Sequence, residues 1–268
     1  MSEQPIIHTE GLTKHFGSIQ AVQDVDFSVR EGEVMALVGD NGAGKSTLIK
    51  MLCGVLEPSA GQVYIRGDPV SFSSYDDARA YGIETVYQDL ALAEKQTVAA
   101  NVFLGKEPLR DDFLGRLLRI VDENYTIEEA KQSLDRVNIP VDPRARVSNL
   151  SGGQQQAVAI ARALQSDPDV MIMDEPTSAL SIEGARNVLG VIDDLRDEGL
   201  SIILISHNIR EVIGIADRIS VLFQGKLTGV RDEDTFDREE IIGMMMGLGA
   251  EEEVEAIEPA QTTEESAA

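Results

Sequence analysis

The sequence is short of cysteine and of basic residues, and each shortage excludes a class of protein. Its 268 residues contain one cysteine, Cys53, which excludes an intrachain disulfide framework and cysteine-rich metal modules. The 23 Lys and Arg residues stand against 47 Asp and Glu residues, so the formal net charge is −24. This balance argues against nucleic acid as a partner, because affinity for its phosphates comes from basic side chains that release counterions.

Long apolar runs are also missing. A helix that spans a bilayer needs roughly 18 or more consecutive apolar residues, whereas the longest apolar runs, such as Val34–Val38 and Ile202–Ile205, have the size of strands. The first five residues, Met1–Pro5, have neither the basic nor the apolar part of a signal peptide. We therefore expect a protein that works in the cytosol.

The excess of acidic residues comes with a shortage of lysine. Only 7 of the basic residues are Lys and 16 are Arg. An acidic, lysine-poor surface is typical of proteins that stay soluble in molar salt, where the Debye length falls to about 3 Å. An ordinary acidic cytosolic protein is the alternative. Residues 249–268 hold seven Glu and no basic residue, which predicts a disordered, solvated tail.

Apolar runs of strand length alternate with segments of helical spacing. Such alternation predicts an α/β fold with a mostly parallel sheet that is covered on both faces. The middle section, from about 89 to 148, lacks buried-strand runs and is predicted to be mostly helical. The expected strands span 34–38, 63–65, 83–86, 170–173 and 202–205, and the expected helices span 46–56, 126–137, 151–164, 181–196 and 208–216.

A phosphate-binding motif follows the first buried strand. The run from Gly39 to Ser46 matches G-x4-G-K-[ST] and lies between that strand and a predicted helix, which is the context such a loop requires. Backbone N–H groups at the helix start would bind phosphate oxygens, Lys45 would reach the β- and γ-phosphates, and Ser46 would hold Mg²⁺. A glycine-rich turn without a ligand is the alternative. The predicted nucleotide-binding residues here are Gly39, Asp40, Asn41, Gly42, Ala43, Gly44, Lys45, Ser46 and Thr47.

Two more segments carry groups suited to phosphate chemistry. The strand at 170–173 runs into Asp174 and Glu175, where the first carboxylate could bind Mg²⁺ and the second could polarise an attacking water as a general base. Acidic turn residues are the alternative when this pair is taken alone. The run Ser151-Gly152-Gly153-Gln154 opens a helix, and its N–H groups and hydroxyl form a second anion site.

The phosphate loop, Leu150-Ser-Gly-Gly-Gln154 and Asp174-Glu175, in this order, resemble the ATP-binding-cassette (ABC) family. The resemblance implies a P-loop NTPase core, an N-terminal antiparallel β subdomain and a helical subdomain at about 89–165, within one ABC ATPase domain over 5–247. It also implies ATP and Mg²⁺ as ligands.

Further positions match the family's motifs. Phe16 resembles the aromatic residue that stacks on adenine, with a plain core Phe as the alternative. Gln88 resembles the glutamine that contacts Mg²⁺ and water and senses the membrane partner. His207 resembles the histidine that contacts the γ-phosphate, where a surface or capping histidine is the alternative. With Glu175, Gln88 and His207 form the predicted catalytic set, and Ser46, Gln88 and Asp174 are the predicted metal ligands.

The resemblance implies that the protein works as a dimer. The phosphate loop of one subunit would bind ATP, and Ser151 and Gly153 of the other would close over the γ-phosphate, which accounts for two separated anion sites in one chain. Ser181 departs from the pattern, because an Asp more often stands there. The carboxylate contact across the dimer is then absent, although Ser181 can still cap the following helix.

Segments outside the motifs, such as Tyr87–Leu92 and Ala100–Gly105, resemble the ATP-binding subunits of ribose, xylose and fructose importers. This likeness implies a subunit at the cytoplasmic face of the membrane that serves two permeases and, indirectly, an external sugar-binding protein. Two alternatives stay open. The cargo could be a nucleoside or another solute, or be exported. The chain could instead be a soluble ABC ATPase that acts on nucleic acid or ribosomes.

Overall fold

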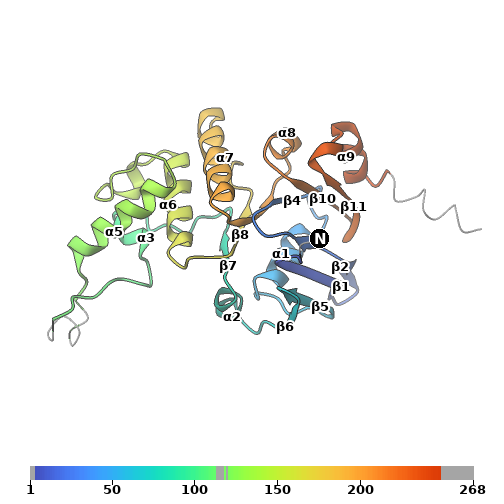
Figure 1. Cartoon of the computed structure of the whole chain (residues 1–268), viewed down its shortest axis with the longest axis horizontal. Coiled ribbons are helices and arrows are strands. Elements are labelled where there is room, and N and C mark those ends of the chain that lie inside the picture. The colour runs from blue at the N-terminus through green and yellow to red at the C-terminus, as the bar shows by residue number, and fades with distance from the viewer. Residues whose placement is uncertain (1–3, 113–117, 119, 249–268) are drawn as a thin grey trace, which may run out of the picture.

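The computed structural model describes residues 4–112, 118 and 120–248. A six-stranded sheet runs through the middle of the molecule, in the order β11-β10-β4-β9-β8-β7 (Figure 1). Its neighbours pair in parallel, except for β11, which pairs antiparallel with β10. The strands are β4 (Val34–Val38), β7 (Ile83–Val86), β8 (Val170–Asp174), β9 (Ser201–Ile205), β10 (Arg218–Phe223) and β11 (Lys226–Asp232).

The central strands are almost entirely apolar because each of their faces meets a separate core. In β4, Val34, Ala36 and Val38 belong to one buried cluster, whereas Met35 and Leu37 belong to another. Strands β8 and β9 divide their side chains in the same way. Continuous burial of this kind is the property of a parallel sheet that is covered on both faces, and the predicted α/β fold is confirmed.

A second, antiparallel sheet packs beside the first, in the order β2-β1-β5-β6, with β3 paired to β1. Its strands are β1 (Ile7–Phe16), β2 (Ile19–Val25), β3 (Ser28–Val29), β5 (Ala60–Ile65) and β6 (Asp68–Val70). The sheet is not purely N-terminal, since β5 and β6 follow the helix after the phosphate loop. These two strands belong to the sheet because of their pairing and not because of their position in the chain, since β5 pairs with β1 from Ile7 to Thr13.

Helices fill the segment between β7 and β8, at the left of Figure 1. Helices α3 (Val98–Val102), α5 (Glu123–Arg136) and α6 (Gly152–Leu164) pack on one another there and share the larger apolar core. The remaining helices are α1 (Lys45–Leu52), α2 (Tyr75–Ala80), α7 (Ile182–Asp197), α8 (Ile209–Ile213) and α9 (Arg238–Met245), with short 3₁₀ turns at Val147–Asn149 and Glu233–Thr235. None of the helices within the described ranges has the length and apolar character needed to cross a membrane.

The first helix ends earlier than its apolar spacing predicts. It was expected to reach residue 56, but α1 stops at Leu52. Gly54 has a φ of +72°, and a Cβ at that position would lie 2.3 Å from the carbonyl oxygen of Ser74. The close approach of Ser74, which caps the start of α2, therefore requires a left-handed glycine, and this ends the helix.

The acidic balance leads to a prediction about salt. Because −24 formal charges repel one another, folding is disfavoured at low ionic strength, where the Debye length is about 30 Å at 0.01 M. At about 1 M KCl that length falls to about 3 Å, and the repulsion is confined to near neighbours. The melting temperature, followed by circular dichroism, should rise from 0.01 M to molar KCl. A flat or falling melting temperature would contradict a protein adapted to high salt.

Candidate functional site

The phosphate loop connects the end of β4 with the start of α1, and its glycines are required by the backbone. Gly39, Gly42 and Gly44 have φ values of +156°, +84° and +109°. A Cβ at Gly39 would lie 2.3 Å from the carbonyl oxygen of Leu222, and one at Gly44 would lie 2.5 Å from that of Ala21. The loop is therefore held tightly between β10 and β2, and larger residues at these two positions would displace it.

The start of α1 offers unpaired backbone donors. Within the described part of the chain, the N–H groups of Gly42, Gly44, Lys45 and Ser46 have no recorded acceptor, and Gly44 caps the helix without a side-chain hydrogen bond. Free N–H groups at a helix N-terminus bind anions, because they donate hydrogen bonds and lie at the positive end of the helix dipole. The start of α1 therefore offers the free donors that the predicted phosphate cradle requires.

Lys45 is buried at the mouth of this loop, with 8% of its surface exposed. Its Nζ donates to the carbonyl oxygens of Gly39 at 2.7 Å and Asp40 at 3.2 Å. Burial lowers the pKa of the Lys45 ammonium, while the carboxylates of Glu175 and Asp174 act in the opposite direction. The ammonium therefore lies within electrostatic range of both acidic residues that end β8.

The two carboxylates differ in their surroundings. Burial, followed by the nearby charge of Glu175, raises the pKa of Asp174, and the positive charge of Lys45 compensates only in part. Glu175 has a φ of +51°, a left-handed conformation that is unusual for a residue with a side chain. Its N–H donates to the carbonyl oxygen of Ile205 on β9, which fixes the turn that directs the carboxylate.

His207 lies against Glu175. The Nδ1 atom of His207 is 2.8 Å from Oε1 and 2.7 Å from Oε2 of Glu175. The carboxylate is nearly buried, at 14% exposure, whereas the imidazole is 62% exposed and lies at the open side of the site. The structure therefore brings together two of the predicted catalytic residues, which come from the ends of β8 and β9.

Gln88 joins the same group through a residue that the sequence had not marked as functional. The Nε2 atom of Gln88 donates to Oγ of Ser178 at 3.4 Å, and Ser178 Oγ donates to the carbonyl oxygen of Glu175 at 3.1 Å. Ser178 thus links the glutamine to the turn of the proposed base. The available signal was its place at the start of the run Ser178–Ser181, which resembles a family motif but which drew attention only to Ser181.

Phe16 ends β1 at the tip of the β1–β2 hairpin and is 46% exposed, so the alternative of a core phenylalanine is wrong. The ammonium of Lys14 lies 5.6 Å from the centre of its ring. The neighbouring strand β2 also supplies Ala21, whose carbonyl oxygen lies in the path of a Cβ at Gly44. An exposed aromatic ring on the hairpin that borders the phosphate loop is suited to stack on a planar base.

The second anion site starts α6 but is not joined to the first. Ser151 caps the helix by a reciprocal pair of bonds with Gln154, in which Ser151 N–H donates to Oε1 at 3.0 Å and Gln154 N–H donates to Oγ at 3.4 Å. Gly152 and Gly153 complete the run and border a cavity of about 520 Å³ shared with Leu180 and Gly184. No hydrogen bond recorded for the described residues connects this run with the phosphate loop.

Ser181 performs the structural role expected of it. Its Oγ accepts from the Gly184 N–H at 3.1 Å and caps α7.

The donors around Asp174 fit a magnesium ion. Mg²⁺ prefers oxygen ligands such as carboxylates, hydroxyls and water. Here Asp174 supplies a half-buried carboxylate whose pKa is raised by burial, and Ser46 follows Lys45 in the phosphate loop. The Gln88 amide reaches the turn at Glu175 through Ser178. Lys45 offsets only part of the rise in the pKa of Asp174. A divalent cation bound beside this carboxylate would lower the pKa further, because a nearby opposite charge favours the ionised form.

Several proteins of known function are similar to this chain. The fructose import ATP-binding protein of Rhizobium meliloti is 39% identical over 92% of this chain and 96% of its own length. The xylose/arabinose import ATP-binding protein of Sulfolobus acidocaldarius is 42% identical over 90% and 93%. A ribose import ATP-binding protein of Rubrobacter xylanophilus is 41% identical over 93% of this chain but 48% of its own length. The chain therefore spans about half the length of that ribose relative.

Solved structures show the same fold. The ADP conformation of the cassette MJ1267 has a TM-score of 0.77 at 28% identity and covers 94% of this chain and 97% of that one. A dimeric post-hydrolysis cassette, MJ0796, bound to ADP and phosphate, has a TM-score of 0.70 at 25% identity and covers 86% and 100%. Residues 22–178 match the family model described as ABC transporter. The chain belongs to the ABC transporter family, as its motifs predict.

Proposed function

We propose that this chain is the ATP-hydrolysing subunit of an ABC importer for a monosaccharide. The observation that carries the proposal is the group formed by Lys45, Asp174, Glu175 and His207 at the open start of α1. It combines the phosphate-binding start of α1 with the Glu175 carboxylate, which His207 holds in position to accept a proton. The sugar importers among the relatives supply the substrate class.

The proposed chemistry is the attack of water on the γ-phosphate of ATP, which yields ADP and phosphate. Free N–H groups of the loop and Lys45 hold the phosphates and stabilise the negative charge of the transition state. Mg²⁺, held by Ser46, Asp174 and Gln88, would neutralise charge on the β- and γ-phosphate oxygens. Thr47, Asp40, Asn41 and Ala43 complete the loop that encloses the phosphates.

Glu175 accepts the proton of the attacking water, because the left-handed turn and the Ile205 hydrogen bond hold its nearly buried carboxylate in place beside His207. His207 orients this carboxylate through Nδ1 and, when a nucleotide is bound, contacts the γ-phosphate. Gln88 and Ser178 connect the same turn to the segment that leads into α3. Phe16 stacks on the adenine.

The active unit is a dimer in which Ser151, Gly152, Gly153 and Gln154 of the other copy complete each ATP site. The lack of any hydrogen bond between the two anion sites, among the described residues of one chain, supports this arrangement. Within each copy, residues 5–247 form the ABC ATPase domain, and the helical subdomain at about 89–165 carries the second anion site. The predicted disorder of residues 249–268 lies outside the described residues.

The subunit works at the cytoplasmic face of the membrane, bound to two permeases that receive sugar from an external binding protein. Another small solute, or export, is the alternative cargo or direction. The test is uptake of labelled ribose, xylose, fructose and a nucleoside by a strain that lacks this gene. Restoring the gene should recover uptake of one sugar, and the Glu175→Gln gene should not. Recovery of nucleoside uptake alone would refute the sugar assignment, and a chain that never co-purifies with a permease would refute the transport role.

A further inference from the structure

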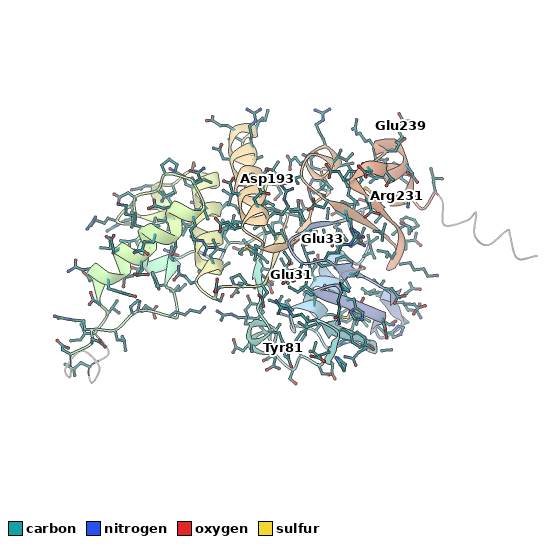
Figure 2. All side chains as sticks on the ribbon, in the orientation of Figure 1. Glu31, Glu33, Tyr81, Asp193, Arg231 and Glu239 are labelled. Carbon is teal, nitrogen blue, oxygen red and sulfur yellow. The ribbon has the colours of Figure 1, made fainter. Side chains whose placement is uncertain are left out.

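A groove between α8 and α9 borders the ATP site. It encloses about 530 Å³, and Asp40 of the phosphate loop and His207 lie at one side of it. The rest of its lining combines apolar residues of α9 with the guanidinium groups of Arg210 and Arg238. In Figure 2, Glu239 is labelled on α9, the helix that forms one side of this groove.

The charges in this groove are unusual for so acidic a chain. The exposed Arg210 and Arg238 form no recorded ion pair with any described residue, although 47 acidic residues are present in the sequence. Asp40 is the one carboxylate of the lining, and Glu211, next to Arg210, already accepts a hydrogen bond from Thr177. The groove therefore offers two cations to an incoming anionic group.

The apolar part of the groove is also exposed to solvent. Met246 is 67% exposed, and Leu248, at the end of the described region, is 68% exposed. Ile242 and Met245 line the groove beside Met246. Water contact with these side chains is unfavourable, so a segment with both apolar and acidic residues would fit this surface.

The chain itself supplies such a segment directly after Leu248. Residues 251–258 read Glu-Glu-Glu-Val-Glu-Ala-Ile-Glu, with Val254 and Ile257 three residues apart among five glutamates. An extended chain covers about 3.3–3.6 Å per residue, so Glu251 is within about 18 Å of Met246, which lines the groove. Because the link is short, the effective concentration of this segment at the groove is in the millimolar range.

We propose that residues 249–268 dock in this groove and weaken ATP binding. The glutamates pair with Arg210 and Arg238, while Val254 and Ile257 cover Met246 and Ile242. Docking brings carboxylates next to Asp40 and His207, where they repel the phosphates of ATP. The coupling to ATP rests on the proposed function, whereas the docking itself does not.

Docking is tested with a chain that ends at Leu248 and a fluorescent peptide of residues 249–268, by anisotropy in 0.1 M KCl. The peptide should bind, and Arg210→Gln/Arg238→Gln should weaken it about fivefold, as expected for two exposed ion pairs. The control Arg144→Gln/Arg146→Gln removes the same charge from an exposed loop elsewhere and should leave affinity unchanged. A peptide with Val254→Ser/Ile257→Ser should also bind more weakly.

Absence of binding at 1 mM peptide, or equal affinity for both double variants, would overturn the docking. A non-hydrolysable ATP analogue should lower peptide affinity, and linkage requires that saturating peptide weaken analogue binding to the shortened chain by the same factor. The full chain, which carries the segment itself, should also bind the analogue more weakly than the shortened chain. Equal analogue affinities would overturn the coupling. If neither chain bound the analogue, the proposed function would fail while the peptide titration still decided the docking.

Discussion

Replacing Glu175 by Gln is expected to reduce ATP hydrolysis by about 10²- to 10⁴-fold, the range for the loss of a general base. The amide keeps the size and hydrogen-bonding reach of the side chain, so ATP binding should persist. Losing one of two neighbouring negative charges also relieves the repulsion that raises the pKa of Asp174. With the chemical step blocked, Mg²⁺-ATP should hold two copies together.

The measurements are phosphate release and the mass by gel filtration with Mg²⁺-ATP, where the variant should elute as a dimer. Glu57→Gln is the matched control, because it makes the same change at an exposed position whose carboxylate forms no recorded contact in the described residues. The control should keep the parental rate. Hydrolysis by Glu175→Gln at that same rate would show that another group is the base.

Lys45→Ala should weaken ATP binding by at least about tenfold and reduce hydrolysis further. Each hydrogen bond from a charged donor contributes roughly 1.5–3 kcal/mol, and an ammonium that meets the β- and γ-phosphates gains more as charge develops in the transition state. The variant also loses the bonds from Nζ to the Gly39 and Asp40 carbonyl oxygens. Some loss of loop order is therefore expected without nucleotide.

Binding is measured by titration calorimetry, and folding is checked by thermal unfolding of the same sample. Lys131→Ala serves as the control, because it removes a lysine from an exposed position on α5. If Lys45→Ala unfolded near the parental temperature and still bound and hydrolysed ATP normally, the phosphate loop would be misplaced. A variant that folds but fails to bind ATP supports the assignment.

Periodicity predicted the buried strands well because burial on both faces leaves a continuous apolar run. It could not assign β5 and β6 to their sheet, since pairing between Ile7 and Ile65 joins residues far apart in the sequence. It also extended α1 too far, because Leu56 fits the helical spacing and the contact that ends the helix comes from Ser74, which spacing does not reveal.

The site was predicted largely from motifs, and the structure adds the contacts that motifs cannot encode. Lys45 and Asp174 were expected to meet at a nucleotide, and they lie within electrostatic range without one. The pairing of His207 with Glu175 was not expected, because the motif assigns His207 to the γ-phosphate. Ser178 was missed as a link, since a hydrogen bond from Gln88 depends on how the loop after β7 folds.

The single thiol of the chain lies in a place that makes the protein convenient for optical studies. Cys53 is fully buried, with its Sγ 3.8 Å from the Lys50 carbonyl oxygen and 3.6 Å from the Tyr87 hydroxyl. A maleimide dye applied to the folded protein should therefore leave this thiol unlabelled. A cysteine introduced on the surface, for example at Ser148, would be the one position that reacts. Donor and acceptor dyes on separate copies could then follow their approach as nucleotide is added, without removing the natural cysteine.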